Sequence, residues 1–184
     1  MSSREINLKE KFVIALNSTA KVISDDFDLN KKNIKDKKTK DIISLEIDNL
    51  TNPSDFLRLR AETDSSALKK KFSDEIIYKK NLPSNNSSRS LYNIAEKIRY
   101  EALGGKMLKG IEKNFHENYS QIINRKRKDQ LKTKEDVPVA EAFELYMLKN
   151  FHNIDLNPLT SRMLNFWEKD FEQSIKQHKE FLLN

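Results

Sequence analysis

The scarcity of glycine is the feature that most restricts what this chain can fold into. The chain has 184 residues but only three glycines and four prolines, and all three glycines lie within residues 104–110. An all-β fold needs many tight turns, and glycine supplies the backbone conformations that such turns require. The sequence therefore predicts a mainly helical protein.

Composition supports the same fold class. Hydrophobic residues make up 37% of the chain and charged residues 34%, which suits helices with one buried stripe and a wide solvated face. The chain has no cysteine, which excludes disulfides and thiolate metal sites and fits a reducing compartment. The N-terminus is too charged for a signal peptide, and no apolar run reaches the roughly 20 residues that span a membrane. We expect a soluble, cytoplasmic protein that makes no contact with a membrane.

Apolar residues spaced by three and four predict about five helices. The predicted helices cover residues 4–24, 53 to about 80, 91–122, about 138–151, and 160 onward. In the second of them, Ile76 and Ile77 are expected to face inward. Ser88 or Ser90 is the expected N-cap of the third helix, Pro138 belongs to the first turn of the fourth, and Thr160 opens the last.

A small β-hairpin is expected near the N-terminus, over residues 26–48. Ile43, Leu45 and Ile47 alternate with polar residues, which is the period of a strand. This strand would pair with residues 26–30. We expect one domain over residues 1–184, in which residues 1–52 form a helix plus the hairpin and residues 53–184 form the helical body.

The glycines lie on or beside the apolar stripe of the predicted helix 91–122. Each glycine costs about 1 kcal/mol relative to alanine in a helix interior, and a kink or a close crossing with another helix would offset this cost. The stretch is not a phosphate-binding loop. Such a loop follows a strand and continues with serine or threonine after its lysine, whereas here a helix precedes the glycines and Met107 follows Lys106.

No catalytic or metal-binding constellation is evident. The histidines are scattered, at positions 116, 152 and 178. Glu112 and His116 could share one face of a helix, but two ligands make no metal site without a third. His178 has the position of a core or interface residue. We expect no catalytic residue, no metal site and no cofactor in this chain.

The formal net charge of +6 leaves a second hypothesis open. The excess of lysine and arginine lies in residues 31–40 and 125–128, and basic surface segments of this kind are usually only solvated. The alternative function is a basic helical adaptor that binds nucleic acid or an acidic protein through residues 31–40 and 125–134. Nucleic-acid binding would weaken steeply as salt rises, whereas an apolar assembly surface would persist.

Several stretches resemble the N-terminal region of the CobT subunit of aerobic cobaltochelatase. The strongest is "LYNIAEKIRYEALGGKMLKGIEKNF" (91–115), followed by "EDVPVAEAFELYMLKNF" (135–151), "MLNFWEKDFEQSI" (163–175) and the weaker "RAETDSSALKKKFSDEI" (60–76). Together they extend in order over nearly the whole chain. The positions that match the family's motifs are Glu96, Arg99, Glu101, Ala102, Gly104, Met107, Gly110, Asp136, Pro138 and Trp167.

The resemblance implies a non-catalytic subunit domain in cobalamin biosynthesis. The family's complex inserts cobalt into hydrogenobyrinic acid a,c-diamide and uses ATP and magnesium. The implied partners are its AAA+ ATPase subunit and its large catalytic subunit, with homo-oligomerisation also possible. Ser73 stands where family members tend to have histidine, which weakens any metal role for that region. Family members continue into a C-terminal von Willebrand A-like domain, which this chain is expected to lack.

The motif positions are therefore candidate partner-interface residues, and each has a structural alternative. The candidates are Glu96, Arg99, Glu101, Gly104, Met107, Gly110, Asp136, Pro138 and Trp167. Gly104 and Gly110 would more commonly serve packing within the chain. Arg99 and Glu101 would more commonly form a local ion pair or be solvated, and Trp167 would more commonly be a core residue.

Overall fold

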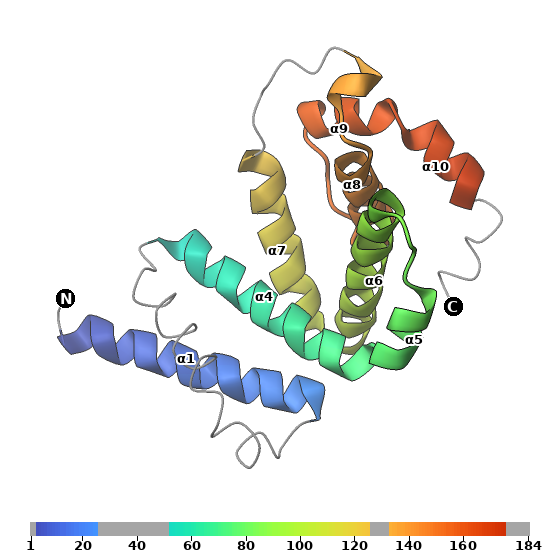
Figure 1. Ribbon diagram of the computed structural model, residues 1–184. Helices are drawn as coiled ribbons and strands as arrows, with labels where there is room; N and C mark the ends of the chain where they lie inside the picture. Colours follow the sequence, from blue (N-terminus) through green and yellow to red (C-terminus); the bar gives the residue numbers. More distant parts are fainter. Residues whose placement is uncertain (1–2, 26–51, 126–132, 176–184) are drawn as a thin grey trace. The chain divides into compact units, whose positions relative to one another are not determined.

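The computed structural model describes residues 3–25, 52–125 and 133–175. Over these ranges the chain forms eight α-helices and one 3-10 helix (Figure 1), so the predicted helical class is confirmed, with more helices than expected. The predicted β-hairpin of residues 26–48 lies outside the described residues. The chain divides into two compact units, Met1–Glu75 and Ile76–Asn184, and each is described by itself.

The first unit is built on two helices, α1 (Ser3–Ser24) and α4 (Pro53–Phe72). Leu16 and Leu59 are buried together where the two helices pack. The rings of Phe12 and Phe56 meet edge to face beside them, with 5.1 Å between centroids. Asn52 caps α4 by accepting a hydrogen bond from the backbone N–H of Asp55. The predicted helix 4–24 and the start of the helix at residue 53 are thus confirmed.

The second predicted helix is shorter than expected, because it breaks at Ser73. This residue is extended (φ −109°, ψ 128°), and its N–H donates to the Lys69 carbonyl at 2.9 Å. A separate short helix, α5 (Glu75–Asn81), follows. The prediction that Ile76 and Ile77 face inward was wrong, since their side chains are 79% and 58% exposed. The extended backbone at Ser73 ends α4 although the apolar spacing continues through it.

The second unit centres on α6 (Asn86–Met107), α7 (Lys109–Arg125) and α8 (Val139–Phe151). Both α7 and α8 pack against α6, while α9 (Pro158–Asn165) and α10 (Glu168–Ile175) pack on α8 (Figure 1). A 3-10 helix, η1 (Lys134–Asp136), precedes α8. The buried apolar residues of this unit include Ile98, Ile111, Phe115, Tyr119, Ile123, Ala142, Leu145, Leu148, Ile154, Met163 and Leu164.

The predicted single helix over residues 91–122 is two helices that meet at a corner. Leu108 is extended (φ −137°, ψ 107°) and donates its N–H to the Gly104 carbonyl at 2.9 Å. The chain then turns back, and α7 packs on α6. A Cβ atom on Gly105 would lie 3.4 Å from the Cβ and 3.6 Å from the Cα of Glu112. A Cβ at this position would therefore just touch Glu112, and a longer side chain would have to displace its neighbours at the corner of α6 and α7.

The remaining helix boundaries differ from expectation in detail. Asn85, not Ser88 or Ser90, caps α6, because its side chain accepts from the Ser88 N–H at 2.7 Å. Asparagine is among the strongest N-cap residues. Pro138 is itself the N-cap of α8.

The predicted last helix is also two helices. The first of them, α9, begins at Pro158, after the cap residue Asn157, whose side chain accepts a hydrogen bond from the Thr160 N–H at 2.9 Å. Helix α9 ends at Asn165, and α10 begins at Glu168. The apolar spacing runs through the break, so the periodicity did not reveal it.

Replacing Gly105 or Gly110 by leucine tests how closely α6 and α7 pack at their shared corner. Gly105→Leu should lower the free energy of unfolding by about 2 kcal/mol, since Gly105 is buried and the side-chain atoms beyond Cβ must displace Glu112 or other neighbours. Gly110→Leu is the matched control, because a Cβ at Gly110 meets nothing within 4 Å. Its stability should stay equal or rise, by up to about 1 kcal/mol from helix propensity. Urea unfolding followed by circular dichroism measures both; equal losses would contradict the close approach.

Candidate functional site

An apolar groove follows one face of α6 beside α8, with a volume of about 410 Å³. Its lining residues on α6 are Tyr92, Ala95, Glu96, Arg99, Ala102, Leu103 and Lys106, and those on α8 are Met147, Asn150 and Phe151. The positions on α6 are three or four apart, so they form one continuous stripe of about four turns. Two of the candidate residues, Glu96 and Arg99, lie in this groove.

Glu96 and Arg99 form a two-pronged ion pair on α6. The Arg99 Nε and Nη2 atoms donate to the two carboxylate oxygens of Glu96 at 2.8 and 2.7 Å. The hydrogen bond to Glu96 is the main reason that the pKa of Arg99 is raised. The Glu96 side chain is only 16% exposed and that of Arg99 42%. The ion pair therefore fixes a charged, directional contact within an otherwise apolar lining.

Lys106 is the second cation of the groove. It is exposed, in the last turn of α6. Within the described part of the chain, its ammonium group forms no ion pair. The groove therefore carries one cation balanced by Glu96 and one that remains unbalanced.

Behind the groove, α6 buries a carboxylate. Glu101 is 1% exposed, and it accepts a hydrogen bond of 2.6 Å from the Tyr119 hydroxyl on α7. The Nε2 atom of His152, the residue that ends α8, lies 3.7 Å from the same carboxylate oxygen. Glu101 thus contacts the two helices that pack against α6.

His152 is held in place by the end of α8. Its N–H donates to the Leu148 carbonyl at 3.1 Å, and Asn153 follows in the left-handed conformation (φ 51°) that ends many helices. The imidazole meets the ring of Phe115 edge to face and lies tilted against the ring of Tyr119, with centroids 5.9 and 5.6 Å away. Burial, with the nearby charges of Lys97 and His116, lowers the pKa of His152 to about 4. The imidazole is therefore neutral at pH 7, and its distance to Glu101 is not that of a charged pair.

Burial also raises the pKa of Tyr119, with Glu101 adding to the effect. Tyr119 therefore stays a hydrogen-bond donor over the whole physiological range. Glu101, Tyr119 and His152 form a buried polar cluster that our sequence analysis missed, because it treated His152 as isolated. A signal was present: Glu101 lies three residues after Ile98 and four before Gly105, on the buried stripe of α6.

The other candidate residues lie away from the groove. Asp136 accepts the Thr133 N–H at 2.8 Å in the cap of η1. Trp167 donates from its indole to the Val137 carbonyl at 3.2 Å, and the ammonium of Lys134 lies 4.2 Å from its ring centroid. Asp136, Pro138 and Trp167 thus gather around the start of α8, where their contacts are within the chain. Gly104 is buried, whereas Met107 and Gly110 are exposed at the α6–α7 corner.

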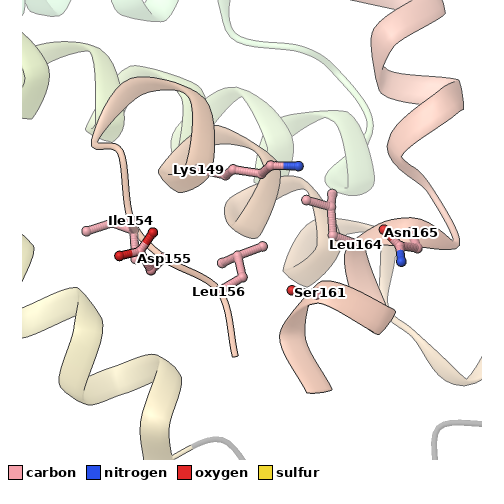
Figure 2. Close-up of a pocket in the computed structure, with 7 residues that line it drawn as sticks. All are labelled: Lys149, Ile154, Asp155, Leu156, Ser161, Leu164 and Asn165. Atoms are coloured by element: carbon pink, nitrogen blue, oxygen red, sulfur yellow. The ribbon is translucent and has the colours of Figure 1, made fainter. Parts of the chain in front are cut away.

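A smaller pocket of about 180 Å³ lies where the end of α8 meets α9 (Figure 2). Its lining residues are Lys149, Ile154, Asp155, Leu156, Ser161, Leu164 and Asn165. None of them is a candidate from the sequence, and Lys149 is engaged by Glu168 at 2.7 Å.

Within residues 3–25, 52–125 and 133–175, no three His, Asp or Glu residues gather to hold a metal ion. None of the helices in these ranges has the length and apolarity to cross a membrane. Residues 31–40 and most of residues 125–134, the basic segments of the alternative hypothesis, lie outside the described ranges.

The buried imidazole predicts a pH dependence of stability. Its pKa is about 4 in the folded chain, against 6.5 for the free group, so the unfolded chain binds more protons between these values. Stability contributed by the neutral form is complete above pH 6.5 and is lost as pH falls to about 4, by roughly 3 kcal/mol. Urea unfolding from pH 7 to pH 4 should show His152→Gln with a shallower pH dependence than the unsubstituted chain. His116→Gln, at an exposed histidine, should retain most of the steep dependence, because burial is the main cause of the lowered pKa of His152 and His116 the smallest; identical slopes for all three would contradict this assignment.

Replacing Tyr119 or Tyr78 by phenylalanine should lower stability by different amounts, because only Tyr119 donates a hydrogen bond to the buried Glu101. Tyr119→Phe removes a buried donor from a carboxylate and should destabilise by about 2 kcal/mol. Tyr78→Phe removes a hydroxyl that donates to Asn93 on the surface and should cost less than about 1 kcal/mol. Thermal unfolding of both variants at pH 7 gives the comparison, and an equal effect would argue against a buried carboxylate that depends on Tyr119.

Comparison with known proteins identifies the family. The family model of the cobalamin biosynthesis protein CobT matches residues 7–182. Neither the curated proteins nor the solved structures include a match to the chain. The matched range spans both units, the whole groove and the buried polar cluster. The chain belongs to the CobT family of cobalamin biosynthesis proteins.

Proposed function

We propose that this chain is a non-catalytic assembly domain of aerobic cobaltochelatase, and that another subunit of the complex docks on the groove of α6 and α8. Membership of the CobT family supports the role in cobalamin biosynthesis. The observation that carries the assembly role is the open groove itself. Its lining includes Glu96 and Arg99, two of the residues by which the chain resembles the N-terminal region of CobT.

The groove has the chemistry of a protein-docking surface. Tyr92, Leu103 and Phe151 are partly exposed along it, and covering such apolar area stabilises a complex by about 25 cal/mol per Å². Aromatic residues and arginine are the types most enriched in protein interfaces. The ion pair of Glu96 and Arg99 is already formed, so a partner meets it without ordering either side chain.

The buried polar cluster of Glu101, Tyr119 and His152 also supports the assembly role. Glu101 contacts α7 through Tyr119 and the end of α8 through His152. Together with the packing of α8 on α6, these contacts favour a groove that is formed before any partner arrives. A preformed surface binds more tightly, because less conformational entropy is lost on association.

In this proposal the chemistry belongs to the rest of the complex. The AAA+ subunit binds ATP and magnesium, and the large subunit holds cobalt and its acceptor, hydrogenobyrinic acid a,c-diamide. This chain contributes docking surfaces and no reacting group. Its partners are one or both of those subunits.

Blocking the groove tests the proposal. Calorimetry of the purified chain with the AAA+ subunit and with the large subunit, each with and without ATP, should give micromolar or tighter binding to at least one. Ala102→Trp places a large side chain in the groove and should weaken that binding at least tenfold. Ala15→Trp is the matched control, because Ala15 is exposed on α1, and it should leave binding unchanged.

Two outcomes would contradict the proposal. These are binding to neither subunit, and equal binding by the two tryptophan variants when circular dichroism shows that both are folded. Binding to nucleic acid that weakens steeply with salt, in place of subunit binding, would favour the basic adaptor instead.

A further inference from the structure

We infer that the groove of α6 and α8 is shaped for an amphipathic α-helix that carries carboxylates along one flank. The inference rests on the proposed function for the identity of the partner subunit. It adds what that function leaves open, which is the chemistry of the segment that docks.

The shape of the groove favours a helix over a compact ligand. Its lining on α6 begins at Tyr92 and ends at Lys106, a distance of about 21 Å along the axis at about 1.5 Å a residue. A helix of about 14 residues matches that length. The volume of 410 Å³ would also suit a small molecule, but it extends along four turns of one helix face, which is the form that helix-binding grooves take.

The smallest residues of the lining lie where a second helix would pack. Ala95 and Ala102 are seven residues apart, two turns along the same face of α6. Small side chains allow helix axes to approach to about 8 Å. Leu103 and Phe151 present larger apolar side chains in the same lining, against which the apolar stripe of an incoming helix would pack.

The charge of the groove determines which charged residues are favoured on the polar flank of the incoming helix. The guanidinium of Arg99 is neutralised by Glu96, whereas Lys106 has no ion pair within the described ranges. The groove therefore has a net positive charge toward the C-terminal end of α6. Aspartate or glutamate on the incoming helix complements Lys106, and lysine or arginine at the same place would be repelled.

Three designed 15-residue peptides test this chemistry directly. The first is an amphipathic helix with leucines spaced by three and four and with glutamates on one flank. The second has lysine in place of each glutamate, and the third keeps the glutamates but has a central proline. Titration of the isotope-labelled chain by NMR should show that the first peptide binds and shifts amide resonances of residues 92–106 and 147–151. The second and third peptides should bind at least about fivefold more weakly.

A charge reversal in the chain completes the test. Lys106→Glu should remove or reverse the preference for the acidic peptide over the basic one. Lys109→Glu is the control, since Lys109 is exposed at the start of α7 and is not part of the groove lining, and it should leave the preference intact.

Several results would overturn the inference. They are the absence of binding by any peptide, equal binding of the proline peptide, no preference between the acidic and basic peptides, and shifts that lie outside the groove. A groove already covered by a second copy of the chain would do the same, and sedimentation detects it as a dimer that Ala102→Trp dissociates.

The result of the peptide test can be told apart from the result of the subunit-binding test. If a subunit binds and Ala102→Trp blocks it, but no peptide binds, the helix inference fails and the assembly role stands. If the acidic peptide binds in the groove but neither subunit does, the assembly role fails and the preference of the groove for an acidic helix stands.

Discussion

The packing of the second unit has to accommodate one buried carboxylate, that of Glu101. Removing Glu101 from water costs several kcal/mol unless hydrogen bonds replace the lost hydration. The Tyr119 hydroxyl provides one at 2.6 Å, and the neutral imidazole of His152 covers the same oxygen at 3.7 Å. These neighbours come from α7 and from the end of α8, although the Nε2 atom of His152 makes no hydrogen bond within the described residues. The carboxylate therefore lies where three helices meet, and its hydrogen bond to Tyr119 links α6 to α7.

The corner at Leu108 makes this arrangement possible. Without it, α6 would continue straight, and Tyr119 would lie about 27 Å along the axis from Glu101. One extended residue reverses the chain, and Gly105 of α6 then faces Glu112 of α7. The three glycines thus have different environments. Gly105 meets a neighbouring helix, Gly104 is buried, and Gly110 faces open space.

The sequence predicted the helical class and several helices, but not their interruptions. Apolar spacing correctly located α1 and α8, because a buried stripe repeats over many residues. The breaks at Ser73 and Leu108 depend on the backbone angles of single residues, and the apolar spacing continues through both. The cluster of Glu101 and His152 was missed for the same reason, since the two meet only after the chain has reversed. Motif resemblance found Glu96 and Arg99, but the groove around them arises from how α8 packs on α6, which no local pattern specifies.

The reversal at Leu108 also lowers the entropy cost of pairing α6 with α7. Glu101 and Tyr119 are close in sequence, so their contact closes a short loop and loses little chain entropy. His152 lies 51 residues from Glu101, so the contact of α8 with α6 closes a longer loop at a higher entropy cost. The groove is lined by residues of both helices and therefore exists only where α8 is packed on α6. In the proposed assembly role, only a chain in which this longer-range packing is complete offers the docking surface.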